Sequence, residues 1–347
     1  MRNGTSLRTG VFMPIALIGL AGWLLIGGAA AVQAAEVSLS PLKKIRIAKS
    51  SGTVEQVAIL SGGAILVRDS NLAKPKEQAL ELYDSRGQLT RRIGKVGPEP
   101  GGYRYLKSVA ATRDHAVWVA DLIGRLSFFS LEGRLLGTKL IQKPGYQIDS
   151  IALDEPHGYF YVGGCLPIRY YLDDGCRLVH QYRTKDRAFV RSFLQTDKAS
   201  IENRLFAFSN ISVDVDAAGR LWTIDAPVFK LLLVDPGSGK ELSFPVESRI
   251  ARPMPKIEQG ADTEGLYENS FHLDRVLASG PYEAVSLRRP QGGLFLAIFD
   301  AQGKQIAADL KPPGVLVGKT GEGRFLFASP VEGGFEIGEY QVKASKP

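Results

Sequence analysis

The chain is 347 residues long and carries 43 Lys and Arg residues against 36 Asp and Glu residues, which gives a formal net charge of +7 at pH 7. The basic residues are scattered, without a basic run or a basic stripe interleaved with aromatic residues. This distribution argues against a nucleic-acid-binding protein. We therefore expect no nucleic acid among the partners.

The N-terminal segment has the pattern of a targeting signal. Arg2 and Arg8 give it a positive start, and residues 11–31 are almost wholly apolar. The segment ends in Val32-Gln33-Ala34, which fits the small-x-small rule for a cleavage site. We expect cleavage after Ala34.

This pattern divides the chain into two parts. Residues 1–34 are predicted to be a signal peptide, and residues 35–347 are predicted to be a single domain that is periplasmic or secreted. The alternative is an uncleaved anchor with the domain facing the periplasm, because the apolar run approaches the ~20 residues that span a bilayer. In that case the N-terminal segment is the only part that meets the membrane.

A sequence repeat of short apolar runs and turns recurs along the rest of the chain. Each copy has an apolar run, a polar turn, a second run that often ends in Asp, and a third run that reaches Asp and Gly. The clear copies begin at Val57, Val109, Ile211 and Val276, and weaker copies begin at Ile151 and Val315. Turns this close together leave no room for helices, so each copy is predicted to be a four-stranded antiparallel blade. Six copies predict an all-β fold, the six-bladed β-propeller.

The last copy lacks an outer strand, because the chain ends soon after its third run at residues 335–342. Residues 42–47 form a strand-like run near the other end that has no partner of its own. Pairing of the two would close the ring and remove unpaired sheet edges. We predict that an N-terminal strand closes the last blade.

Residues 94–103 (GKVGPEPGGY), followed by the repeat at Val109, resemble the six-bladed propellers of the NHL-repeat type. The resemblance covers most of residues 43–342 in the spacing of runs and turns. The Gly-Pro-Glu motif itself occurs once, and its Pro100 departs from the Gly-Pro-Gly-Glu-Phe order that is usual in the family. It implies the propeller fold. Relatives of this type include ligand-binding scaffolds, lactonases and metal-dependent lyases, so the resemblance leaves the function open.

The long connections between runs are predicted to share one face of the propeller. In a four-stranded blade, the first-to-second and third-to-fourth turns lie on one face and the other connections lie on the opposite face. The long segments fall in the second set, and they are residues 71–78, 95–105, 165–176, 196–206 and 247–272. Insertions that gather on one face are typical of a binding face.

Polar residues just before the inner strands should ring the channel mouth on that same face. The predicted ligand-binding residues are Glu55, Lys107, Asp149, Asn210, Asp274 and Arg275. Two interpretations of this ring stay open. In the first, Glu55, Asp149, Asn210 and Asp274 supply oxygen ligands for Ca²⁺ or another divalent ion, as the resemblance to lactonases implies. In the second, Lys107 and Arg275 pair with the carboxylates in a solvated ion network, and no cofactor is bound.

Two further features lie in the long connections. Tyr103, Tyr105, Tyr170 and Tyr171 are predicted to form a partner-binding surface, since Tyr gives contact area at little ordering cost. The two cysteines, Cys165 and Cys176, most simply form a disulfide in an exported protein. A metal or redox role for this pair is the alternative, although no C-x-x-C spacing or partner His accompanies it.

Together these observations favour a non-enzymatic exported propeller that binds an envelope protein or an extracellular polymer through its loop-rich face. The main alternative is a metal-dependent hydrolase of the lactonase kind, in which a divalent ion at the channel mouth polarises an ester carbonyl. A membrane-tethered assembly factor differs from the first hypothesis only in keeping its N-terminal segment.

Overall fold

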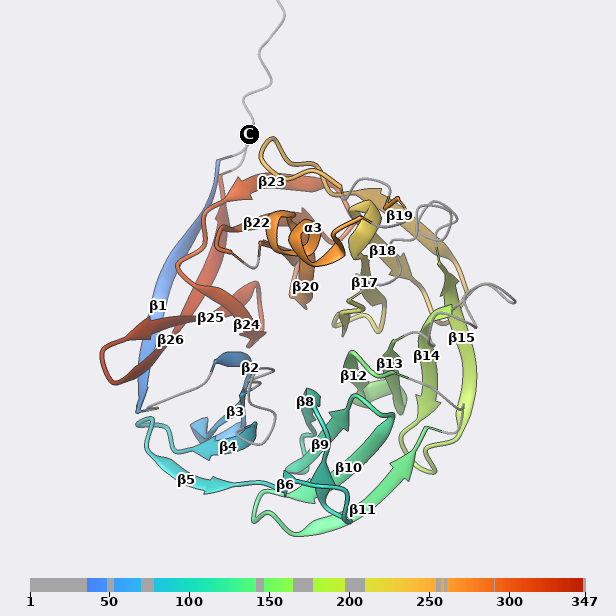
Figure 1. Cartoon of the computed structure of the whole chain (residues 1–347), viewed down its shortest axis with the longest axis vertical. Helices are drawn as coiled ribbons and strands as arrows, with labels where there is room; N and C mark the ends of the chain where they lie inside the picture. The colour runs from blue at the N-terminus through green and yellow to red at the C-terminus, as the bar shows by residue number, and fades with distance from the viewer. Residues whose placement is uncertain are drawn as a thin grey trace, which may run out of the picture. The chain divides into compact units, whose positions relative to one another are not determined.

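The computed structural model describes residues 36–48, 53–69, 78–141, 147–164, 177–196, 210–253, 257–258, 261–289 and 291–345. These ranges form six four-stranded antiparallel sheets, arranged as blades around a central axis (Figure 1). The predicted all-β, six-bladed β-propeller is confirmed. Within the described ranges, no helix has the length and apolar character needed to cross a membrane.

Each blade runs from an inner strand beside the axis to an outer strand at the rim. Blade 1 consists of β2 (Val54–Ile59), β3 (Ile65–Asp69), β4 (Ala79–Tyr83) and β5 (Leu89–Arg92), and blade 2 consists of β8 (Leu106–Ala111), β9 (Ala116–Asp121), β10 (Arg125–Ser130) and β11 (Leu135–Leu140). Blade 3 consists of β12 (Ser150–Asp154), β13 (Tyr159–Gly163), β14 (Arg177–Arg183) and β15 (Phe189–Gln195), and blade 4 consists of β16 (Val213–Val215), β17 (Leu221–Asp225), β18 (Lys230–Val234) and β19 (Glu241–Pro245). Blade 5 consists of β20 (His272–Ser279), β21 (Tyr282–Arg288), β22 (Leu294–Asp300) and β23 (Gln305–Leu310), and blade 6 consists of β24 (Val315–Lys319), β25 (Arg324–Val331), β26 (Gly334–Ala344) and β1 (Val37–Ala48).

The N-terminal strand closes the ring, as predicted. β1 pairs antiparallel with β26, with Ile45 opposite Ile337 and Ile47 opposite Phe335. Ile45 and Ile47 are 8% and 0% exposed, whereas the residues between and beside them are exposed, which is the alternation expected of a strand with one buried face. Blade 6 therefore joins the two ends of the domain.

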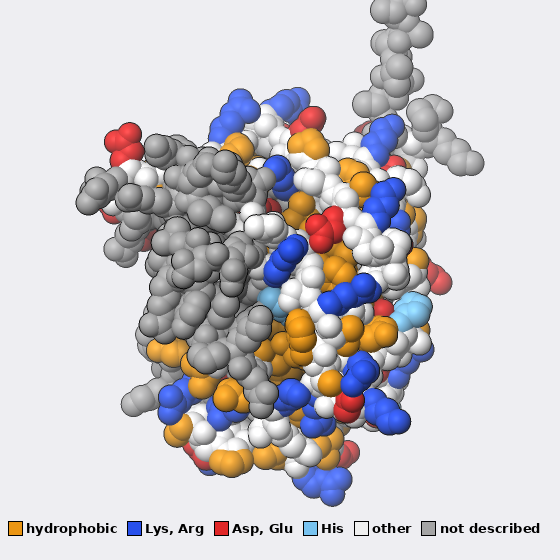
Figure 2. Space-filling view, turned by 90° about the vertical axis from the view of Figure 1, so that its right-hand side faces the viewer, with side chains coloured by type: hydrophobic (Ala, Val, Ile, Leu, Met, Phe, Trp, Pro, Cys, Tyr) orange, Lys and Arg blue, Asp and Glu red, His pale blue; other side chains and the backbone are white. Residues whose placement is uncertain are grey.

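The hydrophobic core lies between neighbouring blades. Second strands such as β9 and β17 are buried on both faces, which explains why their sequences read as continuous apolar runs. Trp118 of blade 2 packs edge-on against Phe160 of blade 3, with ring centroids 5.0 Å apart. The outer strands are more exposed, as in β5 and β19, and side chains such as Phe189 face solvent. Lys and Arg side chains are scattered over the side of the molecule that Figure 2 shows.

The turn between β4 and β5 requires glycine for two reasons. Gly87 has a φ of +80°, which L side chains rarely adopt. A Cβ atom at this position would also lie 1.9 Å from the carbonyl oxygen of Arg46 in β1. This turn of blade 1 therefore lies directly against the closing strand.

The described connections divide between the two faces as predicted. The first-to-second and third-to-fourth turns are all short, and the longest of them runs from Asp235 to Lys240. The longer described connections contain the parallel pair β6 (Lys95–Val96) and β7 (Gly102–Tyr103), and the helix α3 (Thr263–Asn269). In Figure 1, α3 lies in front of β20 and β22 of blade 5. It is tied to that blade by a hydrogen bond from Gln291 Nε2 to Glu268 Oε2 of 3.0 Å.

Candidate functional site

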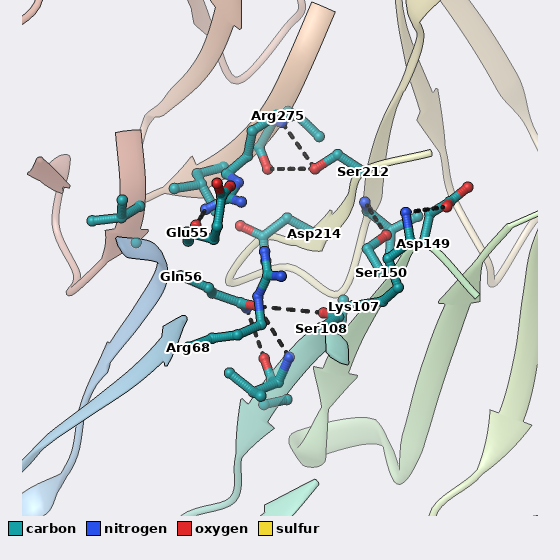
Figure 3. Close-up of a pocket in the computed structure, with 18 of the residues that line it drawn as sticks. Glu55, Gln56, Arg68, Lys107, Ser108, Asp149, Ser150, Ser212, Asp214 and Arg275 are labelled. Carbon is teal, nitrogen blue, oxygen red and sulfur yellow. Dashed lines mark hydrogen bonds and ion pairs between the residues drawn. The ribbon is translucent and has the colours of Figure 1, made fainter. Parts of the chain in front are cut away.

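A polar cavity of about 670 Å³ lies on the axis and is lined by the inner strands of the blades. The six residues predicted at the channel mouth all line it, and they are Glu55, Lys107, Asp149, Asn210, Asp274 and Arg275. Figure 3 labels Glu55, Lys107, Asp149 and Arg275 among them. The lining also contains Arg68, Asp214, Arg288 and Lys319. Its five Lys and Arg residues against four Asp and Glu residues give a net charge of 5 − 4 = +1.

β-Bulges present three of these charged side chains. The pairing of β2 with β3 skips Glu55, that of β8 with β9 skips Lys107, and that of β20 with β21 skips Asp274. A bulge inserts one extra residue and turns its side chain away from the regular alternation. The same irregularity therefore places a charge at the start of the inner strand in blades 1, 2 and 5.

Lys107 and Asp149 form an ion pair between blades 2 and 3. Lys107 Nζ lies 3.3 Å from Asp149 Oδ1, and the Asp149 side chain is 4% exposed. Gln147 Nε2 donates a second bond of 3.1 Å to the same oxygen. Burial raises the pKa of Asp149 above its ordinary value, and the positive charge of Lys107 opposes that shift. The carboxylate is thus held by a cation and an amide donor.

Glu55, Arg275 and Arg288 connect blades 1, 5 and 6 around the mouth. Arg288 Nη1 lies 3.9 Å from Glu55 Oε2. Arg275 Nη1 donates to the backbone carbonyl oxygens of Glu55 and of Leu316, the latter at 3.3 Å. Lys107 therefore pairs with a carboxylate as the ion-network interpretation expects. Glu55 instead faces Arg288, and the described bonds of Arg275 are to backbone carbonyls and not to a carboxylate.

The four residues of the predicted divalent-metal set line one cavity without forming a metal cluster. Among the residues that the structure describes, no three His, Cys, Asp or Glu side chains are placed to hold a metal ion. Asp149 faces Lys107, and Asn210 Nδ2 donates a 2.8 Å bond to the backbone oxygen of Asp274. The pairing of Asp149 with Lys107 is the one that the ion-network interpretation expects, and the metal interpretation stays a prediction.

A row of hydrogen bonds between blades was missed from the sequence. Ser108 Oγ accepts the N–H of Ile151 at 3.1 Å, Ser150 Oγ accepts that of Val213 at 3.0 Å, and Ser212 Oγ accepts that of Val276 at 3.1 Å. Each serine thus binds the inner strand of the next blade. Gln56 does the same in blade 1, since its amide pairs with both the N–H and the carbonyl of Val109.

The sequence does carry a signal for this row. A polar residue stands directly before a β-branched residue at the same point of four repeats, in Gln56-Val57, Ser108-Val109, Ser150-Ile151 and Ser212-Val213. These residues occupy the same position of each repeat, so Ser212 of blade 4 is equivalent to Ser108 of blade 2 and Ser150 of blade 3. Asn210 lines the cavity two residues earlier.

Lys319 reaches the far ends of the inner strands. Its Nζ lies 2.7 Å from Asp214 Oδ2 and donates to the carbonyls of Val215 and Ala278 at 2.9 and 2.7 Å. Asp214 Oδ2 also accepts the N–H of Ala278 at 2.8 Å. Since β16 and β24 end on the face of the short turns, this pair fastens blades 4, 5 and 6 together at that end of the cavity.

The predicted tyrosine surface is wrong at Tyr103. This side chain is 2% exposed, packs in the core between blades 1 and 2, and has its hydroxyl 3.3 Å from the N–H of Leu80. Burial raises its pKa to about 12. Tyr105 is 41% exposed. Tyr170 and Tyr171 lie outside the described residues, as does the predicted disulfide between Cys165 and Cys176.

The buried position of Tyr103 explains the glycine-rich motif around it. β6 and β7 pair in parallel and bring Gly94 against the Tyr103 ring, where a Cβ atom would lie 2.9 Å from a ring carbon. Arg125 donates to the carbonyls of Gly97 and Pro98 at 3.1 and 2.8 Å. The motif that resembles NHL-repeat proteins therefore has a structural role between blades 1 and 2.

The histidines do not converge. His115 and His157 lie in short turns on the face opposite the predicted mouth, and His180 is buried in β14. His272 begins β20 and lines the cavity. The described histidines therefore do not form a site with several imidazoles.

These features define the class of protein: a six-bladed β-propeller with a charged axial cavity, whose inner strands are joined by hydrogen bonds from polar side chains.

The sequence matches no protein-family model and no curated protein. A Bacteroides fragilis protein described as exported is similar in structure, with a TM-score of 0.56 and 11% identity over 91% of this chain and 97% of that chain. Virginiamycin B lyase from Staphylococcus aureus gives a TM-score of 0.53 and 12% identity over 84% and 82% of the two chains. The WD40 repeats of RRP9 give 0.53 and 10% over 85% and 79%. At these identities the similarity shows the fold alone.

Proposed function

We propose that this protein is an exported binding module that recognises an envelope protein or an extracellular polymer through its loop-rich face and the axial cavity. The observation that carries the proposal is the cavity itself, which gathers charged and amide side chains from all six blades. A pocket of this size that combines a few placed polar groups with apolar walls is typical of a ligand site.

Binding without catalysis fits the bonding of these groups. Asp149 pairs with Lys107, Arg275 bonds backbone carbonyls, and Asn210 bonds the carbonyl of Asp274. Side chains committed to neighbours in this way hold the wall of a site in a fixed shape. They are poorly suited to general acid–base chemistry, which requires a group free to exchange a proton with substrate.

Export is supported by the N-terminal pattern, in which Arg2 and Arg8 precede an apolar run that ends in a small-x-small site at residues 32–34. Mass spectrometry of the protein purified from its native cells tests it. We expect a mature chain that begins at Ala35, periplasmic or secreted. A mass that includes residues 1–34 would instead support the membrane-anchored alternative.

The binding role is tested by capture from the native cell envelope, with divalent metal measured on the same purified sample. We expect the tagged protein to enrich one protein or polymer reproducibly, and Tyr105→Ala to weaken that capture. Arg86→Ala is the matched control, because Arg86 is exposed in the short β4–β5 turn on the opposite face. If no partner is enriched, and a stoichiometric metal is found together with esterase activity, the protein is a hydrolase of the lactonase kind instead.

A further inference from the structure

Arg68 is a buried cation that the sequence analysis did not single out. It lies near the end of β3, is 6% exposed, and lines the axial cavity (Figure 3). Its Nη1 donates a 3.1 Å bond to the carbonyl of Leu106, whereas its buried Nε has no hydrogen-bond partner among the described residues. Burial lowers its pKa to about 10, so the side chain stays charged at neutral pH.

A second guanidinium lies close enough to repel it. Arg275 Nη1 donates to the carbonyl of Glu55, and Glu55 directly precedes Gln56, which pairs with Arg68 across β2 and β3. The two cations therefore lie in the same part of the cavity, and the charge of Arg275 lowers the pKa of Arg68 further. The described bonds of Arg275 use Nη1 and end on backbone carbonyls. Two neighbouring guanidinium groups held by backbone bonds therefore keep other N–H donors for a third group. A guanidinium fork fits the oxygens of a carboxylate or a phosphate.

The surrounding acids restrict what that group can be attached to. Glu55 and Asp274 act on Arg68 with favourable charge, and both line the cavity. An isolated anion would meet their repulsion, whereas a ligand that also carries hydroxyl groups would donate hydrogen bonds to them. A protein carboxylate side chain brings no such donors. The combination favours an acid on a hydroxylated skeleton.

We infer that Arg68 and Arg275 form a subsite for the carboxylate or phosphate group of a sugar-like acid, such as one unit of an acidic extracellular polymer. This inference rests on the proposed binding function and names the chemistry of its ligand. The cavity of about 670 Å³ is within the usual range for a small-molecule site.

Isothermal titration calorimetry with purified protein tests the subsite directly. The probes are glucuronate for a carboxylate and glycerol 3-phosphate for a phosphate, with glucose and glycerol as neutral counterparts and acetate as a carboxylate without hydroxyl groups. All are compared at equal ionic strength in chloride. We expect at least one acid to bind, its neutral counterpart not to bind, and acetate to bind more weakly than glucuronate. Acetate binding as tightly as glucuronate would overturn the sugar-like part and point to a protein carboxylate.

Three variants test which residues bind the acid. We expect Arg68→Gln and Arg275→Gln each to weaken binding of the acid about tenfold or more, because each removes a charge-assisted contact. Arg86→Gln, in the same blade as Arg68 but exposed in the β4–β5 turn, should bind as the wild type does. Circular dichroism checks that each variant is folded. If Arg68→Gln does not fold, the Arg275→Gln variant alone tests the subsite. Unchanged affinity in both arginine variants, or no acid binding by the wild type, would overturn the subsite.

The same probes separate this inference from the binding function. If the acid that binds also releases the captured envelope partner, the subsite and the binding function are both supported. If a partner is captured and no acid binds or releases it, the subsite is wrong and the binding function stands. If an acid binds and no partner is ever captured, the subsite stands and the proposed function is wrong.

Discussion

Lys107 Nζ of blade 2 lies 3.3 Å from Asp149 Oδ1, which directly precedes the inner strand of blade 3. The pair joins two blades at the mouth of the axial cavity, with the Lys107 side chain 26% exposed and that of Asp149 4% exposed. Removal of a cation that faces a buried carboxylate leaves an uncompensated charge.

We therefore expect Lys107→Met to lower the free energy of unfolding by about 1–3 kcal/mol in urea titrations. Lys44→Met is the matched control, because the Lys44–Glu336 pair is 2.8 Å long but 53% and 33% exposed. Surface pairs of this kind contribute about 0–1 kcal/mol. Equal effects of the two substitutions would show that the inter-blade pair has no special role.

The serine row predicts a second loss of stability. Ser150→Ala removes the acceptor of the Val213 N–H and the donor to the Ile211 carbonyl, and both of these residues are buried. An unsatisfied buried polar group costs about 1–3 kcal/mol, so thermal and urea unfolding should show a loss of that size. Ser85→Ala, in an exposed turn, should change stability by less than about 0.5 kcal/mol. A neutral Ser150→Ala would contradict the role of these bonds.

Two glycines with similar backbone angles test the closing contact between β1 and blade 1. Gly62 has a φ of +85° and open space where an alanine methyl would lie, whereas at Gly87 the methyl would overlap the Arg46 carbonyl. We expect Gly62→Ala to cost about 1–2 kcal/mol through backbone strain alone. Gly87→Ala should cost clearly more, about 3 kcal/mol or above, because β1 must also shift. Differential scanning calorimetry of the two proteins makes the comparison, and equal losses would refute the contact.

Glu283 gives the stability a pH dependence. It is 0% exposed, neither of its carboxylate oxygens has a hydrogen-bond partner in the described part of the chain, and burial with nearby Asp216 raises its pKa from 4.5 to about 8. Between these two values the folded protein keeps a proton that the unfolded chain releases. Its contribution to stability therefore falls as pH rises through this window, by up to about 1.4 kcal/mol per pH unit.

Glu283→Gln removes this titration while keeping the shape of the side chain. We expect the free energy of unfolding of the variant, minus that of the wild type, to increase from pH 5 to pH 8 and to level off above pH 8. Urea titrations at several pH values measure this difference. A difference that stays constant across the window would show that Glu283 does not titrate in it.

The fold was readable from the sequence because each blade repeats the same order of apolar runs and turns. The start of each inner strand could also be located, and Glu55, Lys107 and Asp149, which were named from those starts, line the cavity. The bulges that present Glu55 and Lys107 could not be seen, since a bulge depends on the register between two strands.

Other site features depend on contacts that one sequence does not show. Arg68 is the fourth residue of the run Ile65–Asp69 and reads as part of a buried strand. Because β3 runs antiparallel to β2, Arg68 lies opposite Gln56, near the start of β2. Tyr103 reads as a loop tyrosine and is buried because β6 and β7 pair across the loop. Long-range pairing decides both positions.

Site-specific photo-cross-linking in the native envelope tests most directly whether the face where the inner strands begin recognises a ligand. A photoreactive phenylalanine analogue in place of Tyr105 reports on that face, and the same analogue in place of Arg86 reports on the opposite face. We expect a discrete cross-linked product from position 105 that excess binding acid suppresses, and none from position 86. A product from position 86 with none from position 105 would contradict it.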